Sequence, residues 1–329
     1  MKAFEYQRAT DVAGAVASHA GRDDVRYLGG GTNLVDLMKL GVENPSVLID
    51  VSGLPLDEIT VSPHGAVVIG AAVRNSDLAA HPAIRNGYPA VAQAVLAGAS
   101  GQLRNMATVG GNLMQRTRCS YFCDTSKPCN KREPGSGCPA RAGDHHNLAI
   151  LGGSEQCIAT SPSDLAVALT AFDAVVHLAT GTGERRIGLA EFRRLPGTHP
   201  EIETNVADGA LVVAVELPPA ALAASSRYRK VRERASYAFA IGSIAAALDV
   251  RDGVIAESRI AWGAVAPVPW RAKLAEQALL GAPATPASFE AAAGAELERA
   301  EPLPGNSYKM DLIRNLTVEV LTELSGGQR

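Results

Sequence analysis

Val25-Arg-Tyr-Leu-Gly-Gly-Gly-Thr-Asn-Leu-Val-Asp-Leu-Met-Lys-Leu40 joins a short apolar strand to a glycine turn and then to residues with helical spacing. Glycines let the backbone approach a ligand closely, and free N–H groups at a helix N-terminus favour an anion, so this order is typical of a phosphate cradle. The turn departs from the dinucleotide fingerprint, because Leu34 stands where a third glycine is expected and no acidic residue follows at a ribose position. No Gly-Lys-Ser/Thr is present, which excludes a P-loop. A glycine-rich turn without any ligand remains the alternative.

A second glycine turn lies in Gln102-Leu-Arg-Asn-Met-Ala-Thr-Val-Gly-Gly-Asn-Leu113. Two such turns in one chain suit a ligand with two phosphates that is held from both sides. A third element, Ala159-Thr-Ser-Pro-Ser-Asp-Leu165, puts Asp164 at the predicted start of a helix. Its structural alternative is an N-cap formed by Ser161 or Ser163, with no ligand involved.

The hydrophobic pattern of the remaining chain predicts an α/β protein. Strands are expected at residues 67–69, 175–178 and 211–217, and helices at residues 164–172 and 310–324. Residues 238–248 fit either a buried strand or a helix, and we favour a strand because residues 249–253 contain a hairpin-turn signal. Composition and pattern both change across residues 217–226, which are the expected junction between two domains.

The chain has 329 residues, enough for about two domains with an ample core. Its net charge of −3 provides no basic field for nucleic acid, and no apolar run is long enough to span a membrane. The N-terminus contains no apolar signal region and no twin-arginine pair before one. We therefore expect a soluble protein, cytoplasmic or periplasmic, whose export would depend on a partner that carries a signal.

All five cysteines lie in one window without helical or strand period: Cys119, Cys123, Cys129, Cys138 and Cys157. Disulfides would leave one thiol unpaired, and a zinc site would usually contain a Cys-x2-Cys pair, which is absent. An iron–sulfur cluster takes four thiolates at irregular spacing and favours nearby cations. The cations of this region are Arg116, Arg118, Lys127, Lys131, Arg132 and Arg141. Spacing leaves all three interpretations open, and His145 and His146 are further candidate zinc ligands.

Together these elements resemble the medium, FAD-binding subunit of the xanthine dehydrogenase / molybdenum hydroxylase family. Residues 28–34 are similar to its first FAD-pyrophosphate loop and residues 108–113 to its second. Ser163-Asp164-Leu165 is similar to the element on the ribose side of the flavin, and Lys230 and Arg234 match a Lys-x3-Arg pair beside the flavin. The FAD-binding residues that this resemblance implies are Leu28, Gly29, Gly30, Gly31, Thr32, Asn33, Leu34, Thr108, Gly110, Gly111, Asn112, Ser163, Asp164 and Lys230. It implies no catalytic acid or base.

The resemblance also implies the domain organisation. Residues 1–221 would form a two-lobed FAD-binding domain of the p-cresol methylhydroxylase / vanillyl-alcohol oxidase type, with FAD in the cleft and an iron–sulfur loop at residues 115–158. Residues 222–329 would form a small α+β C-terminal domain that covers the flavin. Lys230 would stabilise the reduced, anionic flavin, and its structural alternative is a surface lysine at a strand end.

The cysteine window is similar to a stretch in the flavin subunits of periplasmic-type aldehyde oxidoreductases, and related to an insertion in the flavin subunit of 4-hydroxybenzoyl-CoA reductase. Both of these hold a 4Fe–4S cluster, so the resemblance implies one here. We expect its ligands to be Cys119, Cys129, Cys138 and Cys157, because the reductase insertion also has a cysteine just before its Ala-Thr. The alternative set replaces Cys157 with Cys123.

The function implied by the resemblance is electron transfer within a molybdenum-containing aldehyde oxidoreductase or xanthine dehydrogenase-like complex. Electrons would pass from 2Fe–2S clusters of a small subunit to FAD on this chain and on to an external acceptor, while the molybdenum cofactor would reside on a large subunit. Two alternatives are a self-contained small-molecule flavin oxidase with a metal-stabilised loop, and a zinc-stabilised nucleotide-binding scaffold.

Overall fold

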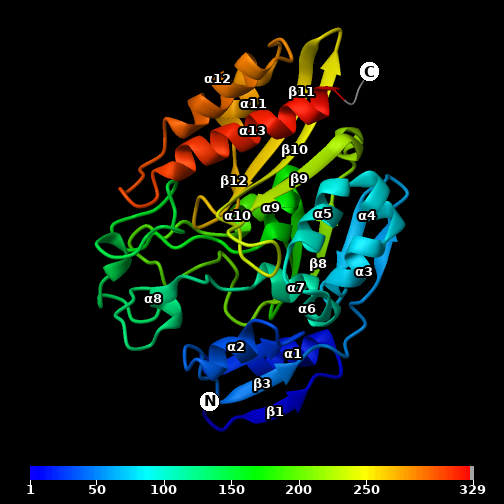
Figure 1. Cartoon of the computed structure of the whole chain (residues 1–329). Coiled ribbons are helices and arrows are strands. Elements are labelled where there is room, and N and C mark those ends of the chain that lie inside the picture. Colours follow the sequence, from blue (N-terminus) through cyan, green and yellow to red (C-terminus); the bar gives the residue numbers. More distant parts are fainter. Residues whose placement is uncertain (327–329) are drawn as a thin grey trace.

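The computed structural model describes residues 1–326 and has three sheets within that range. The N-terminal lobe, at the bottom of Figure 1, is built on a parallel sheet of order β1-β3-β2. Its elements are β1 (Glu5–Arg8), α1 (Val12–His19), β2 (Val25–Leu28), α2 (Leu34–Lys39) and β3 (Val47–Asp50). All four residues of β3 are buried, as expected of a central strand in a parallel sheet. The predicted order of strand, glycine turn and helix at residues 25–40 is confirmed.

The middle lobe contains an antiparallel sheet of order β4-β5-β8-β6-β7. Its strands are β4 (Ile59–Val61), β5 (Val67–Gly70), β6 (Val175–Thr180), β7 (Gly183–Gly188) and β8 (Leu211–Leu217). Its helices are α3 (Asn75–Ala80), α4 (Pro82–Gly87), α5 (Pro89–Ala97), α6 (Gly101–Met106), α7 (Val109–Leu113), α9 (Asp164–Ala171) and α10 (Leu189–Phe192). Apolar side chains of α5, α9 and the sheet form one core, which explains why these short segments are stable.

The C-terminal part has an antiparallel sheet of order β12-β11-β10-β9 covered by helices. Its elements are β9 (Ser226–Val231), β10 (Gly242–Arg251), β11 (Val254–Gly263), β12 (Trp270–Arg271), α11 (Lys273–Leu279), α12 (Pro286–Leu297) and α13 (Tyr308–Gly326). Figure 1 shows α13 lying along the sheet, where the buried Trp262 indole donates to Thr317 Oγ1 at 3.1 Å. The strand predicted within residues 238–248 is confirmed from Gly242 onward, and Asp252 and Gly253 form the hairpin turn.

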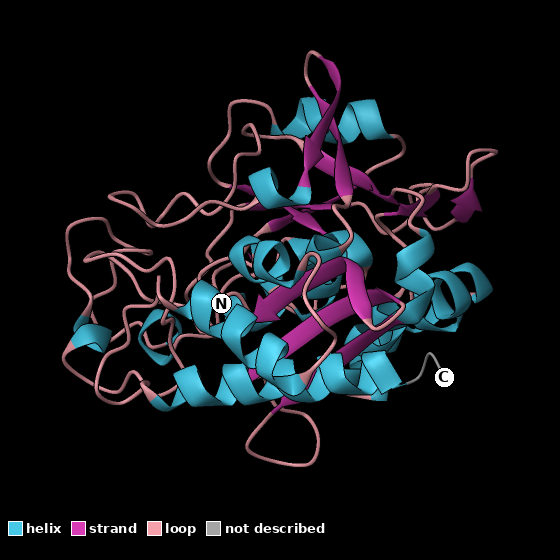
Figure 2. Cartoon of the chain, turned by 90° about the horizontal axis from the view of Figure 1, so that it is seen from above, coloured by secondary structure: helices cyan, strands magenta, loops and turns pink. Residues whose placement is uncertain are grey.

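The segment between α7 and α9 is almost entirely loop, as the absence of any period predicts. It contains only two short helices, α8 (Ser120–Cys123) and η1 (Pro139–Arg141), and Figure 2 shows these loops gathered at one side of the molecule. The region between β8 and β9, predicted as the domain junction, holds a short helix, η2 (Ala221–Ser225). No helix within residues 1–326 has the length and apolar character needed to cross a membrane. The last three residues of the expected C-terminal domain, 327–329, lie outside the described part.

Helix α9 connects the middle lobe to the C-terminal sheet, because it packs on α5 on one side and on β10 and β11 on the other. Seven of its residues are buried, and the pattern Leu-Ala-Val-Ala-Leu offers small apolar contacts on every face. Asp164, the first residue of α9, therefore lies where the two layers meet.

Candidate functional site

The two glycine turns contact each other directly. A Cβ atom at Gly30 would lie 2.0 Å from the backbone oxygen of Met106, so only glycine fits there. A Cβ at Gly29 and a Cβ at Gly111 would each lie 3.0 Å from Thr108 Oγ1, which places these two glycines around the same hydroxyl. The two turns, which are far apart in sequence, therefore pack closely against each other, backbone to backbone.

The first turn offers unpaired backbone donors. Within residues 1–326, the N–H groups of Gly30, Gly31, Thr32 and Asn33 donate to no protein acceptor. Gly31 has a φ of +72°, a conformation that glycine adopts without strain. Asn33 Oδ1 accepts from the Arg116 N–H at 3.1 Å, while its buried Nδ2 has no partner in the described part of the chain. Leu28 ends β2 and Leu34 begins α2, so strand and helix fix both ends of a turn whose amides are free for an anion.

The second turn differs from this expectation, because its leading amides are already used. The Val109 N–H donates to Val73 O at 3.0 Å, the Gly110 N–H to Ala71 O at 2.9 Å and the Gly111 N–H to the N-cap Thr108 Oγ1 at 3.2 Å. These bonds fix α7 against the sheet. The second turn therefore offers no free N–H donors at residues 109–111. What it presents to the first turn is the surface of a glycine without a side chain.

The third element joins the second turn through side chains. Ser163 Oγ donates to Asn112 Oδ1 at 2.6 Å and also accepts from the Ala166 N–H, so Ser163 is the N-cap of α9. Asp164 Oδ2 forms an ion pair with Lys230 Nζ at 2.8 Å, and Tyr228 donates to the other carboxylate oxygen at 2.5 Å. Burial and the Asp164 carboxylate raise the pKa of the Tyr228 hydroxyl well above its usual value, so it remains a donor.

Lys230 is buried, with 3% of its side chain exposed, so the structural alternative of a surface lysine is wrong. Arg234 lies apart from this pair on an exposed loop, where it donates to the Tyr237 carbonyl. The structure therefore brings Lys230 to Asp164 and Ser163 and leaves Arg234 outside the cluster.

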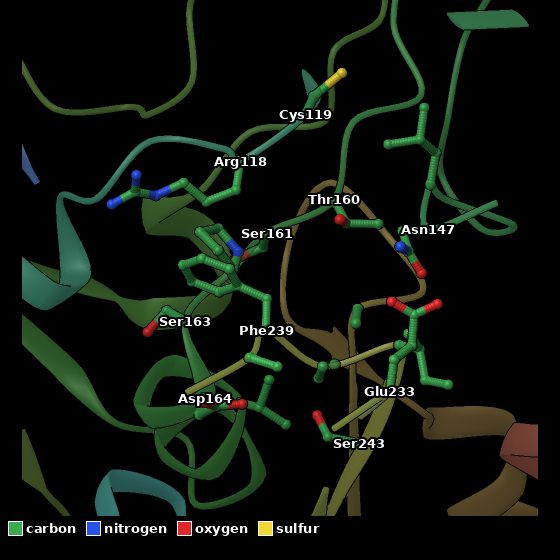
Figure 3. Close-up of a pocket in the computed structure, with 18 of the residues that line it drawn as sticks. Arg118, Cys119, Asn147, Thr160, Ser161, Ser163, Asp164, Glu233, Phe239 and Ser243 are labelled. Carbon is green, nitrogen blue, oxygen red and sulfur yellow. The ribbon is translucent and has the colours of Figure 1, made fainter. Parts of the chain in front are cut away.

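A cavity of about 330 Å³ opens beside Ser163 and Asp164 (Figure 3). Most of its lining comes from residues 118–120, 160–164 and 233–243, and the rest from residues 144–148, Val167, Gly263 and Ala264. Figure 3 labels Phe239, Glu233 and Asn147 among these residues. Among residues 1–326, three buried polar atoms of the lining have no hydrogen-bond partner: Arg118 Nε, Ser161 Oγ and Ser243 Oγ. Unpaired buried polar atoms around a cavity indicate a ligand with polar edges, and an aromatic ring system such as flavin fits this description.

Sequence reasoning missed several residues of this cavity. Phe239 belongs to no recognisable motif, and the sequence marks Arg118 only as one of the cations near the cysteines. Its guanidinium lies 5.4 Å from the centre of the Phe239 ring, which joins two segments that no local pattern connects. For Ser161, the sequence feature that indicates a place in the cavity is its position two residues before Ser163.

Four cysteines line a second, smaller cavity: Cys119, Cys129, Cys138 and Cys157. Cys123 is not among its lining residues, so the structure brings together the four expected thiols and leaves the fifth outside. Burial raises the pKa of the Cys119 thiol to about 12 and also raises that of Cys157. None of the five forms a disulfide. Within the described residues, no three His, Cys, Asp or Glu side chains form a site for a single metal ion.

Cys119 lines both cavities and is therefore part of the wall between them. Thr117 reinforces this wall, because its hydroxyl donates to Thr160 O at 2.9 Å and accepts from the Cys119 N–H at 3.3 Å. The segment that leads to Cys119 thus lies beside the segment that follows Cys157. Both segments run from the cysteine cavity to the cavity beside Asp164.

Several basic residues of the cysteine loop stabilise it through hydrogen bonds and ion pairs. Arg132 donates to the carbonyls of Tyr121 and Phe122 at 2.7 and 2.6 Å, and Lys131 pairs with Glu203 at 2.8 Å. Arg118 pairs with Asp36 of α2. Such contacts tie an otherwise irregular segment to the lobes on either side.

Two family models cover the chain. The FAD binding domain in molybdopterin dehydrogenase matches residues 2–220, and the CO dehydrogenase flavoprotein C-terminal domain matches residues 218–324. Together they span nearly the whole sequence.

Curated relatives and solved structures agree with these models. The chain is 50% identical over 325 residues to the aldehyde oxidoreductase FAD-binding subunit PaoB of Escherichia coli K12, covering 98% of each protein. It is 26% identical to the glyceraldehyde dehydrogenase medium chain of Sulfolobus acidocaldarius, covering 84% of this chain and 81% of that one. A chain of carbon monoxide dehydrogenase from Hydrogenophaga pseudoflava superposes with a TM-score of 0.77 at 25% identity, with coverage of 99% and 98%. On this ground the chain belongs to the molybdenum hydroxylase family, as one of its FAD-binding medium subunits.

Proposed function

We propose that this chain is the flavin subunit of a molybdenum-containing aldehyde oxidoreductase that passes electrons to an external acceptor. The observation that carries the proposal is the contact between the two glycine turns, with four free amides on one of them, in a chain half identical to an aldehyde oxidoreductase FAD-binding subunit. This full-length match disfavours both a self-contained flavin oxidase and a zinc-stabilised scaffold.

FAD, when bound, supplies reversible uptake and release of electrons. The free amides of residues 30–33 would hold its pyrophosphate, and the open face of Gly111 would leave room for it. Ser163, with Asn112, would orient the ribose side of the cofactor. The Asp164–Lys230 pair would act as one unit next to the flavin, because the carboxylate already compensates the lysine charge. The remaining members of the expected set, Leu28, Gly29, Leu34, Thr108 and Gly110, shape the two turns.

We further propose that Cys119, Cys129, Cys138 and Cys157 hold a 4Fe–4S cluster and that Cys123 is not a ligand. The common cavity of these four thiols supports the set, and the place of Cys119 between the two cavities supports an electron path toward the flavin. The adjacent cation Lys131 would compensate part of the negative charge of a cluster held by four thiolates.

The partners of this chain would be a large subunit with the molybdenum cofactor and a small subunit with 2Fe–2S clusters. The matched relatives are named as a subunit and as a medium chain, which supports an assembly of several chains. Residues 1–221 and 222–329 would be its two domains. The protein would be soluble in the cytoplasm or in the periplasm, where it would arrive through a signal on a partner.

The test is aldehyde oxidation by the chain alone and by the chain purified with its co-expressed partners. The isolated chain should hold FAD but oxidise no aldehyde, because no catalytic base or substrate machinery is assigned to it. Addition of the partners should produce turnover with an artificial electron acceptor. Sustained turnover by the isolated chain would contradict the proposal.

A further inference from the structure

A buried carboxylate, Glu203, lies between the FAD-binding turns and the cysteine loop. Its two oxygens form ion pairs with Arg116 Nε at 2.9 Å and with Lys131 Nζ at 2.8 Å. The side chains of Glu203 and Lys131 are only 16% and 9% exposed, so these contacts are shielded from water. Burial alone would raise the pKa of Glu203, but Arg116, Lys131 and Arg193 lower it to about 2.

Each cation around Glu203 belongs to a different part of the two sites. Lys131 is part of the cysteine loop and lines the cavity of the four thiols. The backbone N–H of Arg116 donates to Asn33 at the end of the first glycine turn. Arg193 donates to the carbonyls of Leu113 and Gln115, directly after the second turn. The ion pairs of one carboxylate thus connect the cysteine loop to the first turn, and Arg193, whose charge acts on the same carboxylate, is bonded to the end of the second turn.

Arg116 strengthens the connection on the cysteine side as well. Its guanidinium lies 4.6 Å from the centre of the Phe122 ring in α8, between Cys119 and Cys123. Its second ion pair, to Glu43 at 2.5 Å, fixes it to the N-terminal lobe. Arg116 thus lies between the N-terminal lobe and the cysteine loop, and Glu203 is the carboxylate that joins it to Lys131 of that loop.

We propose that Glu203 is a positioning residue that couples the two cofactor sites, so that a ligated cysteine loop strengthens FAD binding. This inference rests on the proposed placement of FAD and the cluster. Ligation of the four thiols fixes Lys131, which fixes Glu203, which in turn fixes Arg116 beside the first turn. The coupling is reciprocal, so bound FAD also makes iron harder to remove.

The experiment measures the dissociation constant for FAD in the iron-loaded and iron-free forms of the full chain. The variants are Glu203→Gln, which keeps the shape of the side chain, and the control Glu191→Gln, at an exposed position in α10. Loss of iron should weaken FAD binding roughly tenfold in the wild type and in Glu191→Gln. In Glu203→Gln the two forms should bind FAD about equally. A purely structural defect would weaken FAD binding equally in the iron-loaded and iron-free forms, so the ratio of their two dissociation constants would stay at the wild-type value.

Lys131→Met is the second variant, for the case that Glu203→Gln does not fold. It keeps the Arg116–Glu203 pair and the Arg116–Phe122 contact and removes the ion pair between Lys131 and Glu203, so the ratio of its two dissociation constants should fall toward one. The inference is overturned if loss of iron leaves the FAD dissociation constant of the wild-type chain unchanged. It is also overturned if loss of iron weakens FAD binding in the Glu203 and Lys131 variants as much as in the wild type. A wild-type chain without FAD or without iron would overturn the proposed function and this inference together.

Discussion

Lys230 donates a hydrogen bond to the Asp164 carboxylate at 2.8 Å, across 66 residues of sequence. This buried ion pair joins strand β9 of the C-terminal sheet to the first residue of helix α9. Tyr228 donates to the same carboxylate from two residues earlier in β9. The pair therefore holds the C-terminal sheet against the element that we assign to the flavin.

Asp164→Asn should leave the Lys230 ammonium buried without its charge partner. Breaking a buried pair from one side destabilises by about 3 kcal/mol, so the free energy of unfolding of the FAD-free protein should fall by that order. Urea unfolding measures it, with Asp311→Asn as the control, because Asp311 pairs with Arg314 at an exposed position. Asp164→Asn combined with Lys230→Met should recover much of the loss. A single variant as stable as the control would contradict the role of the pair.

Gly111→Val should lose bound FAD while it keeps the fold. A Cβ at Gly111 would lie 3.0 Å from Thr108 Oγ1, a contact that a small movement of the Thr108 side chain relieves, but the valine methyls would enter the space between the two turns. We expect flavin content to fall at least tenfold, about the effect of displacing the phosphates from their cradle. Gly294→Val, at an open position in α12, is the matched control. Full flavin content in Gly111→Val would show that the placement of FAD is wrong.

The fold could be predicted from the sequence where local pattern and long-range packing agree. Strand β8 and helix α9 have clear periods and begin where expected. The segment at residues 238–248 was ambiguous, because a run of alanines and isoleucines fits a buried helix as well as a buried strand. The hairpin turn at Asp252 and Gly253 was the better guide, since turn residues depend on backbone conformation rather than on burial.

Only the parts of the site that lie in recognisable motifs could be predicted from the sequence. The glycine turns and Ser163 follow from sequence, but the used amides of the second turn do not, because their acceptors, Ala71 and Val73, lie on another segment. Glu203 was missed entirely. It lies in a polar loop without period. Its ion-pair partners, Arg116 and Lys131, belong to a segment far earlier in the sequence, so no local signal marks Glu203.

Cys123→Ser and Cys157→Ser should differ in iron content. Cys157 lines the common cavity and Cys123 does not, so Cys123→Ser should keep the cluster while Cys157→Ser should lose or perturb it. Iron analysis and the EPR signal of the reduced protein measure this difference. Loss of iron from Cys123→Ser with retention in Cys157→Ser would replace our ligand set with the alternative one.

Lys309 should make stability depend on pH. Its ammonium is fully buried and donates to Ala264 O at 2.7 Å, and burial lowers its pKa to about 7. The unfolded chain then binds more protons than the folded one between about pH 7 and pH 10, so this residue's contribution to stability rises with pH in that window. Relative to Lys309→Met, the wild type should gain on the order of 2 kcal/mol between pH 7 and pH 9. The exposed Lys273→Met is the control, and parallel curves for all three proteins would contradict the prediction.

Cofactor analysis of the purified full chain shows whether one chain holds both FAD and an iron–sulfur cluster. Flavin, iron, sulfide and zinc are measured on the same sample together with its visible spectrum. We expect one FAD, four irons and four sulfides per chain, with flavin bands above a broad iron–sulfur absorption. A colourless protein that contains zinc and neither flavin nor iron would contradict it.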